Sequence, residues 1–140
     1  MASGDRNPKN PSLQTFNSLF SNPSLFNETD HIGLSNIIDI HPYLTIIPIA
    51  PIRWTFDWAF FWRQSTKDAL YDNVLSIQRP GKKTGERYVG SALSTMVSWQ
   101  ATRHWFFYGA YTHFFPGAFI RDTGPAEALD FFGFWATYKF

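Results

Sequence analysis

The segment Ile52–Arg63 alternates strictly between two kinds of side chain. Its even positions are large and apolar: Ile52, Trp54, Phe56, Trp58, Phe60 and Trp62. Its odd positions are mostly polar and include Arg53, Asp57 and Arg63. Because successive side chains of a strand point to opposite faces, this period of two predicts a β-strand with one apolar face and one polar face. A strand of about ten residues with such faces is typical of a membrane-spanning β-barrel, which has lipid outside and water inside.

The same alternation marks residues 37–47, where Asp39 and His41 lie on the polar face. Pro42 interrupts this segment, and because proline has no N–H for a strand ladder we expect an edge, a bulge or weak pairing there. Only a short turn separates this strand from the next one. The two segments are therefore predicted to form an antiparallel hairpin.

Three further strands are predicted over residues 88–101, 105–115 and 129–140, and in the first of them Val89, Leu93, Val97 and Trp99 are assigned to the apolar face. The middle one carries aromatic residues on both faces, and we assign Trp105, Phe107 and Tyr111 to its outward, apolar face. The last one alternates up to the final residue. Its apolar positions are Phe132, Phe134, Ala136, Tyr138 and Phe140.

Long polar segments over residues 1–33, 64–87 and 116–127 lie at one end of these strands, and tight turns lie at the other end. Bacterial outer-membrane barrels have this asymmetry, with long extracellular loops and short periplasmic turns. We therefore predict an all-β fold, an antiparallel transmembrane β-barrel represented here by about five strands. Residues 1–33 would form an extracellular loop and residues 34–140 the strands and loops. A disordered tail is the alternative for residues 1–33.

The composition agrees with a membrane wall. Charged residues make up 16% of the chain and aromatic residues 19%, whereas about 25% charged residues is usual in soluble domains. A net charge of +1 without a dense basic block offers no argument for nucleic-acid binding. No run approaches the roughly 20 apolar residues of a spanning helix. Cysteine is absent, which excludes disulfides and thiolate metal sites.

The strand count indicates an incomplete barrel. Closed bacterial barrels have an even number of strands, starting at about eight, and an open edge in lipid leaves backbone groups unpaired. The first residues, MASGDRNPKNPS, lack the apolar core of a secretory signal peptide. We therefore expect the C-terminal segment of a larger barrel, a truncated reading frame, or a subunit that closes by association with further strands or another subunit.

An enzymatic interpretation finds little support. The best constellation is His31, Asp39, His41 and His113, but a metal site needs three or four convergent ligands and these residues are scattered over the predicted strands. No serine lies on a nucleophile elbow, and no glycine loop is suited to phosphate. We predict no catalytic residue, no metal ligand and no cofactor.

A soluble barrel or sandwich that binds sugar is the alternative of another class. In that fold the tryptophan and phenylalanine face would form a core. Extraction that requires detergent would favour the membrane barrel, and a soluble monomer would exclude it.

The end of the chain and a series of sequence blocks resemble a known family. Tyr138-Lys139-Phe140 closes an alternating strand in the way that outer-membrane barrels do for recognition by the assembly machinery, and Phe132, Phe134, Tyr138 and Phe140 would form this signal. The blocks, in order, are SGDRNP, TFNSLF, SNIIDIHPYL, DWAFFWRQSTKDALYD, RYVGS, THFFPGAFIRDTGP and FWATYKF. Together they resemble the C-terminal part of the alginate export family of outer-membrane porins.

The resemblance implies a channel for an anionic uronate polysaccharide such as alginate, embedded in outer-membrane lipid. It also implies that lumen arginines attract the carboxylates of the polymer, at the matching positions Arg53 and Arg63, with Arg121 at the mouth. Asp39, His41 and Asp57 share the same predicted lining. From the residues alone, either Arg53 or Arg63 could instead pair with an aspartate across the wall. A general porin, or an incomplete barrel that does not conduct, is the alternative function.

Overall fold

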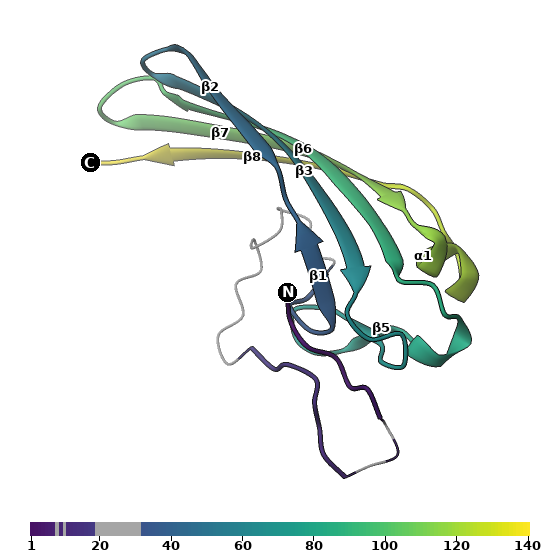
Figure 1. Cartoon of the computed structure of the whole chain (residues 1–140). Coiled ribbons are helices and arrows are strands. Elements are labelled where there is room, and N and C mark those ends of the chain that lie inside the picture. Colours follow the sequence, from purple (N-terminus) through teal and green to yellow (C-terminus); the bar gives the residue numbers. More distant parts are fainter. Residues whose placement is uncertain (8, 10, 19–31) are drawn as a thin grey trace.

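The computed structural model describes residues 1–7, 9, 11–18 and 32–140, and it consists mainly of one curved antiparallel sheet (Figure 1). The sheet has six strands in the order β1-β3-β6-β7-β8, and β2 also pairs with β3. The strands are β1 (Ile37–Ile40), β2 (Tyr43–Ile49), β3 (Ile52–Arg63), β6 (Tyr88–Gln100), β7 (Trp105–Pro116) and β8 (Leu129–Tyr138). The predicted all-β, antiparallel arrangement of consecutive hairpins is confirmed.

Strands β1 and β2 are two pieces of one predicted strand. Ile40 lies opposite Phe60 on β3 and Tyr43 lies opposite Asp57, so the pairing continues with the same register across the gap. At the interruption Pro42 donates nothing, but its carbonyl accepts a 3.0 Å bond from the N–H of Trp58. The strand is therefore interrupted at this proline without a change of register, so of the outcomes expected there no bulge forms.

The pairing register fixes the two faces of the sheet. Trp54 lies opposite Val97, Val97 opposite Gly109, and Gly109 opposite Phe134. Because directly opposed residues share a face, we call this side the apolar face and the other side the polar face. Phe107 lies opposite Trp99 and is thus on the apolar face, as predicted for Trp105, Phe107 and Tyr111.

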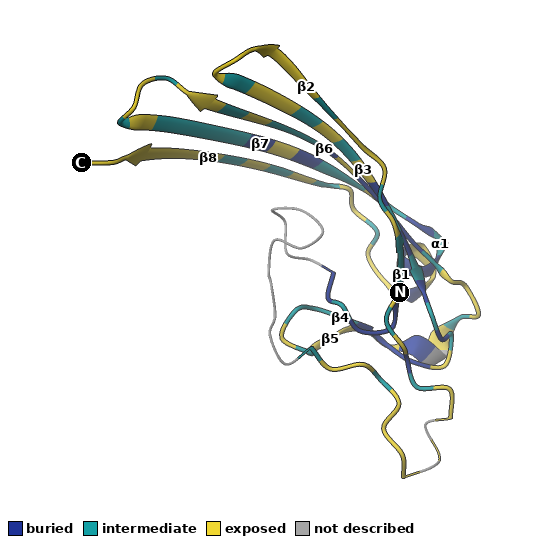
Figure 2. Ribbon diagram, turned by 60° about the vertical axis from the view of Figure 1, so that its left-hand side comes forward, coloured by how far each residue is buried: buried dark blue, intermediate teal, exposed yellow. Residues whose placement is uncertain are grey.

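Long segments at one end of the sheet carry structure that the sequence did not predict. They contain β4 (Leu70–Tyr71), β5 (Ile77–Arg79), a 3-10 helix over Gly81–Lys83 and α1 (Ala118–Thr123). Buried residues gather at this end, near β1 and α1 (Figure 2). Among the described residues, no helix is long and apolar enough to cross a membrane.

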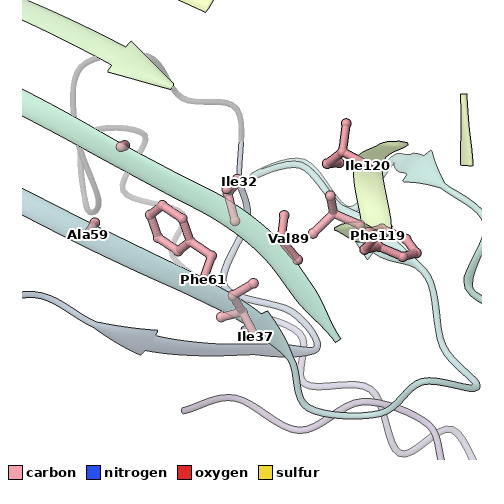
Figure 3. Packing of buried hydrophobic residues seen from close by; sticks show 9 residues of the cluster. Ile32, Ile37, Ala59, Phe61, Val89, Phe119 and Ile120 are labelled. Atoms are coloured by element: carbon pink, nitrogen blue, oxygen red, sulfur yellow. The ribbon is translucent and has the colours of Figure 1, made fainter. Parts of the chain in front are cut away.

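A small core joins these segments to the strand ends. Phe61, Val89 and Phe119 are fully buried in it, together with Ile37 (Figure 3). The sequence placed Val89 on the apolar face, and this was wrong. The register shifts where Phe61 lies opposite Gly90 and Trp62 lies opposite Tyr88, so Val89 is the extra residue of a bulge and packs into the core.

The first residues of the chain pair with the outer side of β1. The N–H of Ala2 donates to the carbonyl of Ile37 at 2.7 Å, and the N–H of Ile37 donates to the carbonyl of Ala2 at 3.1 Å. Asn36 N–H donates in turn to Ser3. The predicted loop over residues 1–33 is thus partly docked, while its residues 8, 10 and 19–31, His31 among them, lie outside the described residues.

Candidate functional site

Arg63, at the end of β3, is the largest side chain that is fully buried. Its guanidinium lies 3.9 Å from the ring centroid of Phe119. Its nitrogens donate to backbone carbonyls of the segment that follows: Thr66 at 3.1 Å, Asp68 at 3.0 Å, Gly81 at 3.0 Å, Thr84 at 3.0 Å and Glu86 at 3.1 Å. Arg63 therefore holds this segment in place over the end of the sheet.

This environment differs from the carboxylate site expected for Arg63. Within the described residues, Arg63 forms no salt bridge with any aspartate or glutamate. The reason is that residues 64–87 fold back over the end of β3 and present backbone carbonyl groups to the guanidinium, such as those of Asp68, Gly81 and Thr84. A buried guanidinium supplies five N–H donors and satisfies them.

Two further buried polar residues, Asn36 and Asp68, complete this support. Asn36 donates to the carbonyls of Ser65 at 3.0 Å and Ala69 at 2.9 Å, and it accepts from the N–H of Ser65. Asp68 accepts bonds from two distant positions, the Asp5 N–H and the Thr15 hydroxyl, and from the nearby Tyr71 hydroxyl. The sequence reading missed both. The signal for Asp68 lay in the block DWAFFWRQSTKDALYD, whose polar residues after Arg63 have no place on a strand face, and the signal for Asn36 lay in the block SNIIDIHPYL, directly before the first strand.

The phenol of Tyr71, which donates to Asp68, makes the stability of this region depend on pH. Burial, and then the bond to Asp68, raise its pKa from 10.0 to about 12. A raised pKa means that the protonated phenol stabilises the folded state below pH 10, and that this contribution is lost as the pH rises towards 12. We expect Tyr71→Phe to lower the free energy of unfolding at pH 8 by about 1 kcal/mol, measured by denaturant unfolding. Between pH 10 and 12 the free energy of unfolding should fall less in the Tyr71→Phe variant than in the wild type, because the variant has no phenol to ionise. Equal losses in both proteins would contradict the assignment.

On the polar face, Asp39, His41 and Asp57 come together as their shared parity predicted. His41 Nε2 lies 2.5 Å from Asp57 Oδ2, and His41 Nδ1 lies 3.8 Å from Asp39 Oδ2. The other carboxylate oxygen of each aspartate has no hydrogen-bond partner within the described part of the chain. Asp39 and His41 also line a hollow of about 700 Å³ together with residues of the N-terminal segment.

His41 is thus the partner of the two aspartates, for which the sequence suggested an arginine. Within the described residues, neither Arg53 nor Arg63 is paired with Asp39 or Asp57. This cluster of one imidazole and two carboxylates is polar lining, and it carries net negative charge whenever both carboxylates are ionised.

Arg53 lies near the other end of the polar face and is exposed. It lies opposite Ser98, Ser98 lies opposite Tyr108, and Tyr108 lies opposite Trp135. The rings of Tyr108 and Trp135 are 5.2 Å apart between centroids. A guanidinium and two aromatic rings therefore share one row across the sheet.

The remaining candidate residues do not join this row. Arg121 is exposed on α1 and donates to the carbonyl of Pro116 at 2.7 Å. His113 lies opposite Leu93 on the apolar face, where its Nδ1 is 2.7 Å from Asp130. His41 and His113 are therefore on opposite faces. The described residues contain no group of three metal-ligating side chains.

The residues of the predicted C-terminal assembly signal lie on the last strand. Phe132 lies opposite Tyr111, Phe134 opposite Gly109 and Tyr138 opposite Trp105, all on the apolar face. Their side chains, and that of Phe140, are exposed. Strand β8 is an edge of the sheet, so this aromatic row stands at an edge that is open to a partner.

Comparison with known proteins adds the family. The sequence model described as alginate export matches residues 1–134. No curated protein and no solved structure matches the chain. The family match covers almost the whole chain, including every strand except the end of β8. On this evidence, the chain belongs to the alginate export family.

Proposed function

We propose that this chain is part of the wall of an outer-membrane β-barrel, with its apolar face in lipid and its polar face lining a water-filled channel. The observation that carries the proposal is the aromatic apolar face, on which one cluster reaches the loop end and another reaches the turn end, with Trp54 and Phe56 between them at 4.7 Å between ring centroids. At the loop end, Trp58, Phe60, Trp62 and Tyr88 follow one another with ring centroids 5.0, 6.3 and 5.6 Å apart. At the turn end, Trp99, Phe107, Trp105 and Tyr138 are spaced by 5.5, 5.7 and 4.9 Å.

The distance between the outer ends of these two clusters matches the thickness of a bilayer. Trp62 and the residue opposite Trp99, Ile52, are ten positions apart on β3. This corresponds to about 33 Å along a strand, or roughly 25 Å of height at a tilt of about 40°. Outer-membrane barrels carry two aromatic girdles around an apolar band of about that height. A soluble monomer rarely exposes so large an apolar surface.

The two edges of the sheet indicate whether these strands alone can close a barrel. Beyond the contact of Ala2 with Ile37, the outer sides of β1 and β2 and the outer side of β8 carry no further ladder among the described strands. Unpaired N–H and C=O groups in lipid cost several kcal/mol each. We therefore infer that these residues form the C-terminal segment of a barrel, closed by further strands or by another subunit, and that β8 is recognised by the assembly machinery.

The transported solute follows from the family and from the row that contains Arg53. Membership of the alginate export family favours an anionic polysaccharide. Arg53 can bind a carboxylate with its guanidinium fork, and the rings of Tyr108 and Trp135 offer apolar surfaces for a sugar ring. Arg121, exposed near the end of β7, would attract the polymer at the mouth. Asp39, His41 and Asp57 would line the path between them.

Conductance of the complete barrel in a planar bilayer tests this function. We expect an open channel that polyuronate blocks and that a neutral glucan of equal length does not. Arg53→Gln should weaken the block roughly two- to fivefold, which is the effect of one exposed charge pair. Arg103→Gln, in the exposed turn after β6, removes the same charge outside the polar face and should have no effect. A channel indifferent to polyuronate would indicate a general porin, and a detergent-free soluble monomer would exclude a membrane barrel.

A further inference from the structure

A basic pocket lies at the loop end of the sheet, away from the row of Arg53. Its volume is about 350 Å³, and its charged lining residues are Arg6, Lys67 and Arg87. The other lining residues among those that the structure describes are neutral, so none of them contributes a carboxylate. All three cationic residues are exposed. A pocket with this lining is suited to an anion.

The pocket opens on the apolar side of the sheet. One of its lining residues, Ile38, lies opposite Trp62 and thus on the apolar face. Its neighbour Ile37 is turned to the other face and is buried. Trp62 belongs to the aromatic cluster at the loop end, next to Tyr88. The pocket therefore lies directly beyond this aromatic cluster, where the headgroups of the outer leaflet would be.

The two chain segments that form the pocket are tied to each other. Gln64 Oε1 accepts from the N–H of Gly4 at 3.1 Å, and the Ser65 hydroxyl donates to the carbonyl of Asp5 at 2.6 Å. Arg87 Nη1 donates to the carbonyl of Gln64 at 2.9 Å, which orients the guanidinium. These bonds hold the backbone next to Arg6 and Lys67 in place, close to the oriented guanidinium of Arg87.

The positive charges of the pocket are not neutralised by a carboxylate partner among the described residues, and Arg87 keeps its other N–H groups beside the Nη1 bond to Gln64. Within the described residues, none of Arg6, Lys67 and Arg87 takes part in a salt bridge. An arginine can bind two phosphate oxygens at once, and a lysine contributes a further point charge. Clustered basic side chains at a membrane surface typically bind anionic lipid headgroups.

Resting on the membrane orientation proposed above, we propose that this pocket binds a phosphate of a phosphorylated glycolipid in the outer leaflet. The three cationic side chains take the phosphate, and Ile38 faces the apolar part of the lipid. A polyuronate chain in the channel would pass along the polar face, on the other side of the sheet. The side on which Ile38 lies therefore favours lipid over polysaccharide.

The test uses the complete barrel in nanodiscs that contain either a bisphosphorylated lipid A or the same lipid without phosphates. Retained lipid is counted by native mass spectrometry. We expect the phosphorylated lipid to be retained and the dephosphorylated lipid to be lost. The double variant Arg6→Gln/Lys67→Gln should bind the phosphorylated lipid roughly thirtyfold more weakly. The matched control Lys83→Gln/Arg103→Gln removes two exposed charges outside the pocket and should bind like the wild type.

Protease protection in the nanodisc is measured first, because it separates this proposal from the proposed function. A barrel that does not insert overturns both. A barrel that inserts but retains the lipid equally in the double variant and its control overturns the lipid site alone. Displacement of the lipid by millimolar inorganic phosphate would assign the pocket to free phosphate, and displacement by polyuronate would assign it to the exported polymer. Either result overturns the proposal.

Discussion

Replacing Arg63 with methionine is expected to lower the free energy of unfolding by about 3–5 kcal/mol. Methionine fills a similar volume but donates no hydrogen bond. The carbonyls of Thr66, Gly81 and Thr84 would be left without the donor that they have in the structure. Each buried acceptor without a partner costs about 1–3 kcal/mol, less whatever the segment regains by relaxing. Denaturant unfolding in lipid vesicles, followed by the fluorescence of the 6 tryptophans, measures the loss.

Two variants control for charge and for size. Arg53→Met makes the same substitution at an exposed position of the same strand and should change stability by less than about 0.5 kcal/mol. Arg63→Lys keeps the charge but loses the planar fork, so an intermediate loss is expected. The segment 64–87 should also become sensitive to protease in Arg63→Met before the strands do. If Arg63→Met were as stable as Arg53→Met, the structural role of Arg63 would be refuted.

An arginine in place of Val97, on the apolar face of β6 and just inside its turn-end aromatic cluster, is expected to destabilise the barrel in a bilayer by about 1–3 kcal/mol. Val97 lies between Trp54 and Gly109, two residues before Trp99 of the turn-end cluster, and the residue is 40% exposed. If that exposure is to water, a charge there costs almost nothing. If it is to lipid, the guanidinium has to be brought into hydrocarbon.

The adjacent residue supplies the control. Met96 points to the polar face, opposite Thr55 and Ala110, and has a volume close to that of arginine. Met96→Arg should therefore leave stability in vesicles within about 0.5 kcal/mol of the wild type. Equal stability of the Val97→Arg and Met96→Arg proteins in vesicles would place water on both faces and would refute the proposed membrane orientation.

The strands of this protein could be predicted because their signal is local. Alternation within Ile52–Arg63 defines a strand and both of its faces without reference to any other segment. Short turns then join neighbouring strands, so the pairing of β3 with β2 and of β6 with β7 follows from chain order. Even the weak point at Pro42 follows from the chemistry of one residue.

Part of the candidate site was predictable for the same reason. Asp39, His41 and Asp57 share a parity on paired strands, and the register brings them into contact. The position of Val89 was not predictable. A bulge at Val89 changes the parity, and the next residue, Gly90, has a φ of +151° with the carbonyl of Phe115 where a Cβ would be. The alternation of apolar and polar residues does not show where a bulge shifts the register.

By itself the sequence determined the antiparallel strands, their two faces and the resemblance to alginate exporters, because each depends on side chains a few residues apart. Only the tertiary structure decided what Arg63 does. Its partners lie between Thr66 and Glu86, and they meet it only because that segment folds back over the end of β3. An arginine on a polar face has the same sequence signature whether it faces a channel or a layer of carbonyls. What separates the two is the path of a loop that has no periodicity.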